Sequence, residues 1–182
     1  LRQLSLKIKG KGWKGVGGWI CAQKAEKYAD IPEEEYWKRR IKVANEAGFD
    51  YWKVDWGKED RNGEWRRRLT SMGKRYAPHL YIEHALRNEF IEFSDVFRTY
   101  DVENIMAQPI TIQRICDLLP YKTVNGAKGI INSEDEPYIA VGLGCAIGVM
   151  RHSFAGTLPD GTQDFVFPPT GRDIKRRLDE VV

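Results

Sequence analysis

Tyr51-Trp52-Lys53-Val54-Asp55-Trp56 is the stretch that decides the fold. Side chains alternate between the two faces of a β-strand, so Lys53 and Asp55 share one face and the three apolar residues between and around them share the other. We expect the apolar set, Trp56 included, to pack outward against helices, which leaves Lys53 and Asp55 pointing into a barrel lumen. Burying charge is costly unless it is paired, and (β/α)8 barrels place their active sites at the carboxyl ends of their strands. The stretch therefore predicts a functional site, with a structural ion pair as the alternative.

The segments before this strand predict another strand and a helix. Gly15–Ala22 is apolar without a helical period, which is typical of a strand. Pro32 occupies the position of a first helical residue, and Gly48 follows the last one, where a left-handed cap is expected. The residues between them include apolar side chains at helical spacing, namely Trp37, Ile41 and Ala44.

The rest of the chain continues this alternation of short strands and amphipathic helices. Further strands are predicted at Leu80–Glu83, Val96–Tyr100, Gly129–Asn132 and Gly148–His152, and further helices are predicted to begin near Gly63, Pro109, Pro137 and Arg172. Strands alternating with helices imply a parallel sheet with right-handed crossovers. We predict an α/β fold of the parallel (β/α)8 TIM-barrel type, incomplete, with about six βα units and the first strands missing. Residues 1–182 then form one partial catalytic domain.

Two structural alternatives stay open. A doubly wound open sheet also alternates strands and helices, but its Gly-rich phosphate loop after a strand is missing here. The stretch from Leu1 to Lys9 is the other open point, because it could belong to one of the missing strands.

Composition and charge exclude several classes of protein. The chain is 42% hydrophobic and 30% charged with a net charge of +3 and no basic block, so it is an ordinary globular protein without a nucleic-acid-binding signature. The longest apolar run, Ile139–Met150, is too short to span a bilayer. The three cysteines have neither metal-ligand nor disulfide spacing. The oligomeric state and the compartment stay open: secreted or periplasmic if a signal peptide precedes Leu1, cytoplasmic otherwise.

Aromatic residues are concentrated early in the chain. All six tryptophans fall between residues 13 and 65. Flat aromatic faces stack on sugar rings, but they also fill cores, so for most of these residues we expect packing. Trp19 and Trp56 are the two that we assign to sugar contact.

Four motifs, in this order, resemble the clan D glycoside hydrolases, the α-galactosidase and α-N-acetylgalactosaminidase families 27 and 36. The Lys-x-Asp strand ending is the most specific of them, and the resemblance covers nearly the whole chain, from the third barrel strand to the start of the last helix. The motifs are Gly17-Gly18-Trp19, Tyr51-Trp52-Lys53-Val54-Asp55-Trp56, Phe97-Arg98-Thr99-Tyr100-Asp101 and Glu134-Asp135-Glu136-Pro137.

The resemblance implies a retaining glycosidase that cleaves a terminal α-linked sugar without metal or organic cofactor. Asp55 would be the nucleophile, Lys53 would bind sugar hydroxyls, Arg98 would contact the 2-hydroxyl and Asp101 would be the acid/base. A retaining mechanism needs two carboxyl groups about 5–5.5 Å apart across the anomeric carbon. The implied partner is a carbohydrate substrate, with no nucleic acid and no membrane.

The resemblance also implies weaker assignments and shows departures. Glu83 and His84 end the strand at which the family recognises the substituent at C2 of the sugar. Trp19 and Trp56 would contact the sugar ring. Asp101 follows Arg98 after two intervening residues, where three are expected, so Asp95 and Glu103 are rival proton donors. The family's first strands and its trailing antiparallel domain have no counterpart here, which indicates an incomplete domain.

Two other functions compete with hydrolysis. A non-catalytic carbohydrate-binding fragment would explain the tryptophans and the incomplete barrel. A metal-dependent barrel enzyme could use Asp55, Glu83 and Asp101 as hard oxygen ligands, although Lys53 would then lie beside the cation.

Overall fold

The chain divides into two compact units, Leu1–Phe97 with Thr123–Gly129 and Arg98–Lys122 with Ile130–Val182. The structure is a computed structural model, and it describes residues 1–84, 90, 92–98, 112–113, 116–117, 130–134, 137–148, 156–157 and 163–164.

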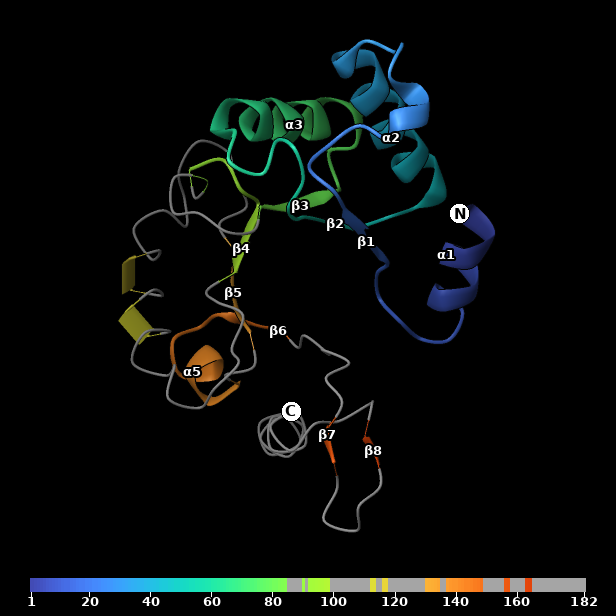
Figure 1. The fold of residues 1–182 in the computed structure, drawn as a ribbon. Coiled ribbons are helices and arrows are strands. Elements are labelled where there is room, and N and C mark those ends of the chain that lie inside the picture. Colours follow the sequence, from blue (N-terminus) through green and yellow to red (C-terminus); the bar gives the residue numbers. More distant parts are fainter. Residues whose placement is uncertain are drawn as a thin grey trace. The chain divides into compact units, whose positions relative to one another are not determined.

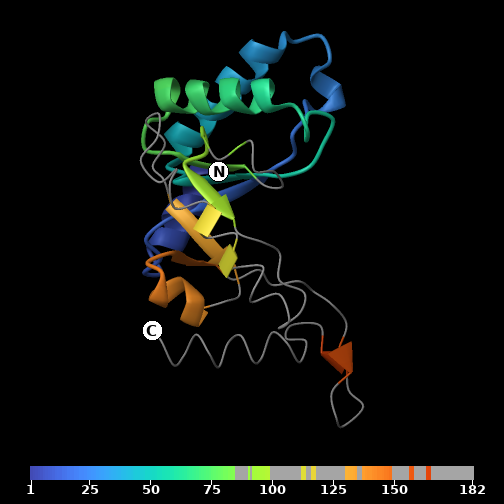
Figure 2. The ribbon, with the colours of Figure 1, turned by 90° about the vertical axis from the view of Figure 1, so that its left-hand side faces the viewer.

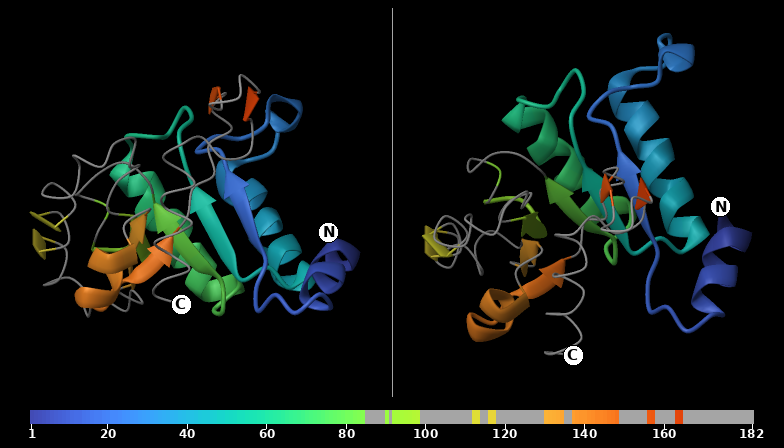
Figure 3. Two further views of the ribbon diagram at one scale, coloured as in Figure 1. Left: turned by 90° about the horizontal axis from the view of Figure 1, so that it is seen from below. Right: turned by 60° about the horizontal axis from the view of Figure 1, so that its bottom comes forward.

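The first unit is built on a parallel sheet. β1 (Gly17–Ile20), β2 (Tyr51–Val54) and β3 (Tyr81–His84) are parallel neighbours in that order, and β4 (Val96–Arg98) pairs with β3 at Val96. β1 and β2 run side by side in the same direction (Figure 3). The connections contain η1 (Glu26–Tyr28), α2 (Glu33–Ala47) and α3 (Gly63–Tyr76), while α1 (Arg2–Lys9) precedes β1. The predicted strands and helices of this part are therefore confirmed, with their ends shifted by no more than two residues.

The ends of α2 follow from two residues. Pro32 is the N-cap, so α2 begins one residue later than predicted, and Gly48 takes the left-handed conformation (φ 72°) as predicted. The amide of Gly48 donates to the carbonyls of Ala44 and Asn45, which closes the last turn. A glycine is needed here because a side chain strains at positive φ.

α2 and α3 lie on the same side of β1–β3 and cover one face of the sheet (Figures 1 and 2). Trp52 and Val54 are buried in the core between them, as the alternation predicts. Trp56 is 66% exposed, so of its two predicted roles the packing against the helices is wrong, and the contact with sugar stays a prediction. The reason is that β2 ends at Val54, and the alternation of faces does not extend past the strand.

A carboxylate joins the two helices of this core. Oε1 of Glu33 accepts hydrogen bonds from Nε1 of Trp37 at 2.7 Å and from Nε1 of Trp65 at 2.9 Å. Both rings are buried and pack edge to face, with their centroids 5.4 Å apart. Packing rather than sugar contact is therefore confirmed for Trp37 and Trp65.

The first nine residues form no strand. Arg2–Lys9 is the helix α1, so the stretch does not supply one of the missing strands. Ser5 Oγ and Lys9 Nζ both donate to the carbonyl of Gly48, at 3.2 and 2.9 Å, and Lys9 forms an ion pair with Asp50 at 2.7 Å. Asp50 Oδ2 also accepts the amide of Val16 at 2.9 Å. α1 is thus fastened to the turn between α2 and β2.

The second unit contains a βαβ unit. β5 (Ile130–Glu134) and β6 (Ala146–Gly148) are parallel and are connected by α5 (Pro137–Gly142). β6 comes earlier than the predicted strand at 148–152, because Gly144 takes a positive φ of 66° and turns the chain directly after the helix.

A short antiparallel pair, β7 (Gly156–Thr157) and β8 (Gln163–Asp164), lies between the predicted strand at 148–152 and the predicted helix near Arg172, where the sequence predicts neither. Strands of two residues show no alternation that a sequence pattern could reveal. The predicted helix near Pro109 is described only at residues 112–113 and 116–117, which are helical, and the predicted last helix lies outside the described residues.

Parallel strands connected by helices are the α/β arrangement that the sequence predicts. Closure into an eight-stranded barrel stays a prediction. Of the helices that the structure describes, none combines the length and the apolar character required to traverse a bilayer.

Candidate active site

The register of the first unit brings three predicted site residues into one row. Trp19 lies opposite Lys53, and Lys53 lies opposite Glu83. Residues paired in this way project from the same face of a sheet, and this is the face away from the buried Trp52 and Val54. Glu83 is fully buried in this row.

Asp55 follows β2 directly and lies beside this row. Its amide donates to the carbonyl of Ile20 at 2.9 Å, which keeps it next to β1. Its Oδ2 accepts a hydrogen bond from Nε1 of Trp19 at 2.8 Å and lies 3.8 Å from Nζ of Lys53. The side chains of Lys53 and Asp55 are 18% and 17% exposed, so the pair is accessible but largely shielded. An indole N–H and an ammonium group both stabilise negative charge on a carboxylate.

One exposed indole contacts this carboxylate, and a second exposed indole is its neighbour in the sequence. Trp19 is 53% exposed and contacts Asp55 through its hydrogen bond, and Trp56 follows Asp55 in the chain. Large exposed aromatic faces beside a shielded charge are suited to stacking on the apolar face of a sugar.

The backbone after Asp55 packs tightly against the end of β1. Ala22 donates its amide to the carbonyl of Trp56 at 2.8 Å and accepts the amide of Glu59 at 2.8 Å. Gly57 lies between them with φ 147°, and a Cβ there would approach the backbone of Ala22 to 2.8 Å. Only glycine fits this close contact.

Gly57→Ala is therefore expected to lower the free energy of unfolding by about 1–3 kcal/mol, because it combines an unfavourable φ with a clash against fixed backbone. Urea denaturation followed by circular dichroism measures this loss. Gly63→Ala is the matched control, since its φ is not positive and its nearest contact is the ring of Phe90 at 3.6 Å. Equal effects of the two substitutions would contradict this explanation.

His84 does not join the row of Trp19, Lys53 and Glu83. It pairs with Val54 and lies fully buried on the helix side of the sheet. Its Nδ1 is 3.2 Å from Nη1 of Arg66, and its Nε2 is 2.7 Å from Oγ1 of Thr70. Both ring nitrogens are therefore occupied by α3, and His84 is left out of the proposed sugar site.

Arg66 is a functional candidate that sequence reasoning missed. Arg66-Arg67-Arg68 resembles a solvated run, yet Arg66 is fully buried. The available signal is helical spacing, because a stripe at i, i+3, i+4 and i+7 is buried, made of Arg66, Leu69, Thr70 and Gly73.

Burial and the neighbouring Arg66 hold the pKa of His84 well below its usual value of 6.5. The unfolded chain binds a proton at this histidine below about pH 6.5, and the folded chain does not, so folding is opposed there. Stability from this group is complete above pH 6.5 and falls with decreasing pH.

We expect the free energy of unfolding to drop by at most about 1.6 kcal/mol between pH 6.5 and 5 through His84 alone. Denaturation of the wild type and of His84→Gln at both pH values measures this, and the variant should lose less on acidification. Glu35 and Asp50, whose pKa values are lowered below their ordinary values of 4.5 and 3.8, titrate below this window. Identical losses in the two proteins would refute the assignment.

The remaining predicted residues are only partly described. The backbone of Arg98 lies in β4, whereas its side chain, Asp101 and Glu103 lie outside the described residues. Asp95 is buried directly before β4 begins, and its Oδ2 accepts the amide of Ile82 at 2.9 Å. It therefore lies at the amino end of its strand, away from the carboxyl ends where Asp55 lies.

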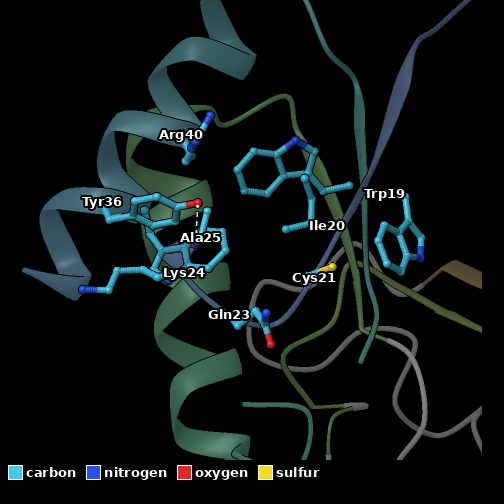
Figure 4. A pocket seen from close by; sticks show the side chains of 10 residues that line it. Trp19, Ile20, Cys21, Gln23, Lys24, Ala25, Tyr36 and Arg40 are labelled. Carbon is cyan, nitrogen blue, oxygen red and sulfur yellow. Dashed lines mark hydrogen bonds between the residues drawn. The ribbon is translucent and has the colours of Figure 1, made fainter. Parts of the chain in front are cut away.

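A cavity of about 290 Å³ lies between β1 and α2, with Trp19 at its rim. Figure 4 shows Trp19 on the side of β1 away from Tyr36 and Arg40. The cavity belongs to the helix side of the sheet, and Asp55 is not among its lining residues. The cavity is therefore distinct from the immediate surroundings of the Asp55 carboxylate.

Within the part of the chain that the structure describes, no three His, Cys, Asp or Glu side chains are grouped to hold a metal ion. No model of a known protein family matches the chain, and no curated protein matches it significantly. The candidate function therefore depends on the residues around Asp55.

Proposed function

We propose that the chain is part of a retaining glycosidase that cleaves a terminal α-linked sugar, an α-galactoside first, with Asp55 as nucleophile. The observation that supports this most is the placement of the Asp55 carboxylate at the carboxyl end of a parallel strand. There it accepts a hydrogen bond from Trp19 and lies 3.8 Å from Lys53. Barrel enzymes build their active sites at such strand ends.

The contacts of Asp55 suit nucleophilic attack. Trp19 holds Oδ2 at 2.8 Å, which leaves Oδ1 as the oxygen for attack on the anomeric carbon. In the first step, the carboxylate forms a bond to that carbon while the bond to the leaving oxygen breaks, and an acid protonates the leaving group. Water then hydrolyses the ester with the same acid acting as base. Asp101 is the acid/base that we propose, with Glu103 as its rival.

A fluorosugar with an activated leaving group tests the nucleophile. The second step becomes slow, so the covalent intermediate accumulates, and peptide mass mapping locates the label. We expect the label on the peptide that carries Asp55. The exposed Asp30→Asn variant should be labelled equally, and Asp55→Asn should not be labelled. Labelling of another peptide in the wild type would refute the proposal.

Carbohydrate binding without catalysis is the second candidate, and the exposure of Trp19 and Trp56 favours it. In that case Asp55→Ala leaves the sugar affinity intact, while Trp19→Ala and Trp56→Ala lower it, and the wild type shows no turnover. Titration calorimetry with galactose, together with an activity assay, separates the two functions.

A further inference from the structure

Arg66 holds backbone rather than a carboxylate. Its guanidinium donates to the carbonyl of Val54 from Nη1 at 2.9 Å and to that of Asp55 from Nη2 at 2.6 Å, and its Nε donates to the carbonyl of Asp60 at 3.0 Å. Among the residues described, no carboxylate lies within ion-pair distance of it. Burying a guanidinium is costly. Its burial against three backbone carbonyls, with no carboxylate to offset the charge, therefore needs an explanation.

These contacts fix the direction of the Asp55 side chain. The carbonyl of Val54 belongs to the peptide plane before the Asp55 Cα, and the carbonyl of Asp55 belongs to the plane after it. Two rigid planes on either side of a Cα determine its φ and ψ, and hence the direction of the Cα–Cβ bond. One guanidinium therefore holds both planes.

A closed hydrogen-bond loop holds the guanidinium in turn. A guanidinium has donors only, so Nδ1 of His84 must accept from Nη1, and the ring proton is on Nε2. That N–H donates to Oγ1 of Thr70 at 2.7 Å, and the Thr70 hydroxyl donates to the carbonyl of Arg66 at 3.3 Å. Every donor in the loop has one acceptor, which leaves a single arrangement.

The charge of this group persists at neutral pH. Burial lowers the pKa of Arg66 to about 10, while Asp60 and Asp55 act in the opposite direction. Phe90 covers one face of the guanidinium, with its centroid 4.9 Å away. A positive charge therefore lies within hydrogen-bond distance of the Asp55 backbone, while Trp19 contacts the Asp55 carboxylate.

We propose that Arg66, held by His84 and Thr70, is a positioning residue that aims the Asp55 carboxylate at Trp19 and Lys53 by holding the two peptide planes around Asp55. The catalytic consequence of this inference rests on the proposed function of Asp55. The positioning of the carboxylate does not rest on it, because the hydrogen bond from Trp19 to Asp55 reports the direction of the carboxylate without any substrate.

The ¹H–¹⁵N resonance of the Trp19 indole is the readout for geometry, assigned by its loss in Trp19→Phe. Arg66→Met should move this resonance in the same direction as Asp55→Ala does, since Asp55→Ala removes the acceptor and Arg66→Met turns it away. Arg66→Lys keeps the positive charge but has only one nitrogen donor in place of three. It should therefore move the Trp19 resonance less than Arg66→Met does. The indole resonances of Trp37 and Trp65, which donate to Glu33, should stay in place and show that the fold is kept. A folded Arg66→Met protein with an unmoved Trp19 resonance would overturn the proposal.

Thr70→Val is the second variant, in case Arg66→Met does not fold. It keeps the shape of the side chain and opens the loop at one hydroxyl, so the Trp19 resonance should move in the same direction. Ser71→Ala is its control, because that exposed hydroxyl donates only to the carbonyl of Arg67. Equal spectra of Thr70→Val and Ser71→Ala would count against the loop.

Kinetics test the catalytic consequence. Arg66→Met should lower kcat by about 10- to 100-fold with KM changed less than about threefold, since a misaimed nucleophile slows chemistry more than binding. An unchanged kcat would refute this part. If fluorosugar labelling misses Asp55, the glycosidase proposal fails, and the Trp19 resonance still decides whether Arg66 aims the carboxylate.

Discussion

Asp55→Ala should lower kcat on an activated aryl α-galactoside by about 10⁴-fold or more, because removal of a nucleophile removes the covalent path. The loss comes from chemistry rather than folding, since the Asp55 side chain lies just past the end of β2 and its contacts are with Trp19 and Lys53. Initial rates over a range of substrate concentrations measure the effect.

Azide should restore turnover of Asp55→Ala and should give a glycosyl azide of inverted configuration. The small anion enters the space left by the carboxylate and displaces the leaving group in a single step. The wild type should give a product of retained configuration. Asp30→Ala is the control for loss of a surface charge, and its rates should match those of the wild type. More than about a tenth of the activity remaining in Asp55→Ala would contradict its role as nucleophile.

Trp52→Ala should lower the free energy of unfolding by about 3–5 kcal/mol. The indole is 2% exposed and packs between β2 and α2, so its removal leaves a cavity in the core. Urea denaturation followed by circular dichroism measures the loss without depending on tryptophan emission.

Trp56→Ala is the matched control for this prediction. It removes the same side chain four residues later, from a position that is 66% exposed, and should change stability by less than about 0.5 kcal/mol. Similar losses of stability at the two positions would contradict the explanation that burial of Trp52 causes its larger effect. The same Trp56→Ala protein serves the sugar-binding test.

Local signals predicted much of the first unit. Pro32 and Gly48 mark the ends of α2. Proline fixes φ and glycine permits a positive φ in any sequence context, so both signals can be recognised locally. The alternation in residues 51–54 placed Trp52 and Val54 in the core because it is a property of one strand. Trp56 escaped the pattern because the end of a strand depends on its neighbours, here the contact of Gly57 with Ala22.

The site itself depends on contacts between distant segments. Lys53 and Asp55 were predicted from their spacing, but the bond from Trp19 to Asp55 joins residues 36 positions apart and requires the register of β1 against β2. Arg66 and His84 also depend on contacts between distant segments, because their hydrogen bond joins α3 to β3. Helical spacing indicates that Arg66 is buried, but it does not show which backbone groups Arg66 binds. A side chain that donates hydrogen bonds to backbone carbonyls of another element leaves no motif in the sequence.

The attachment of α1 to the turn after α2 has a consequence for the order of folding. An isolated helix of eight residues is not stable in water, because forming its first turn is unfavourable and few residues repay it. The acceptors that hold it, the carbonyl of Gly48 and the carboxylate of Asp50, are synthesised about forty residues later. We therefore expect residues 2–9 to stay unstructured during synthesis until Gly48 and Asp50 have been made, so that α1 becomes ordered after α2 although it precedes α2 in the sequence.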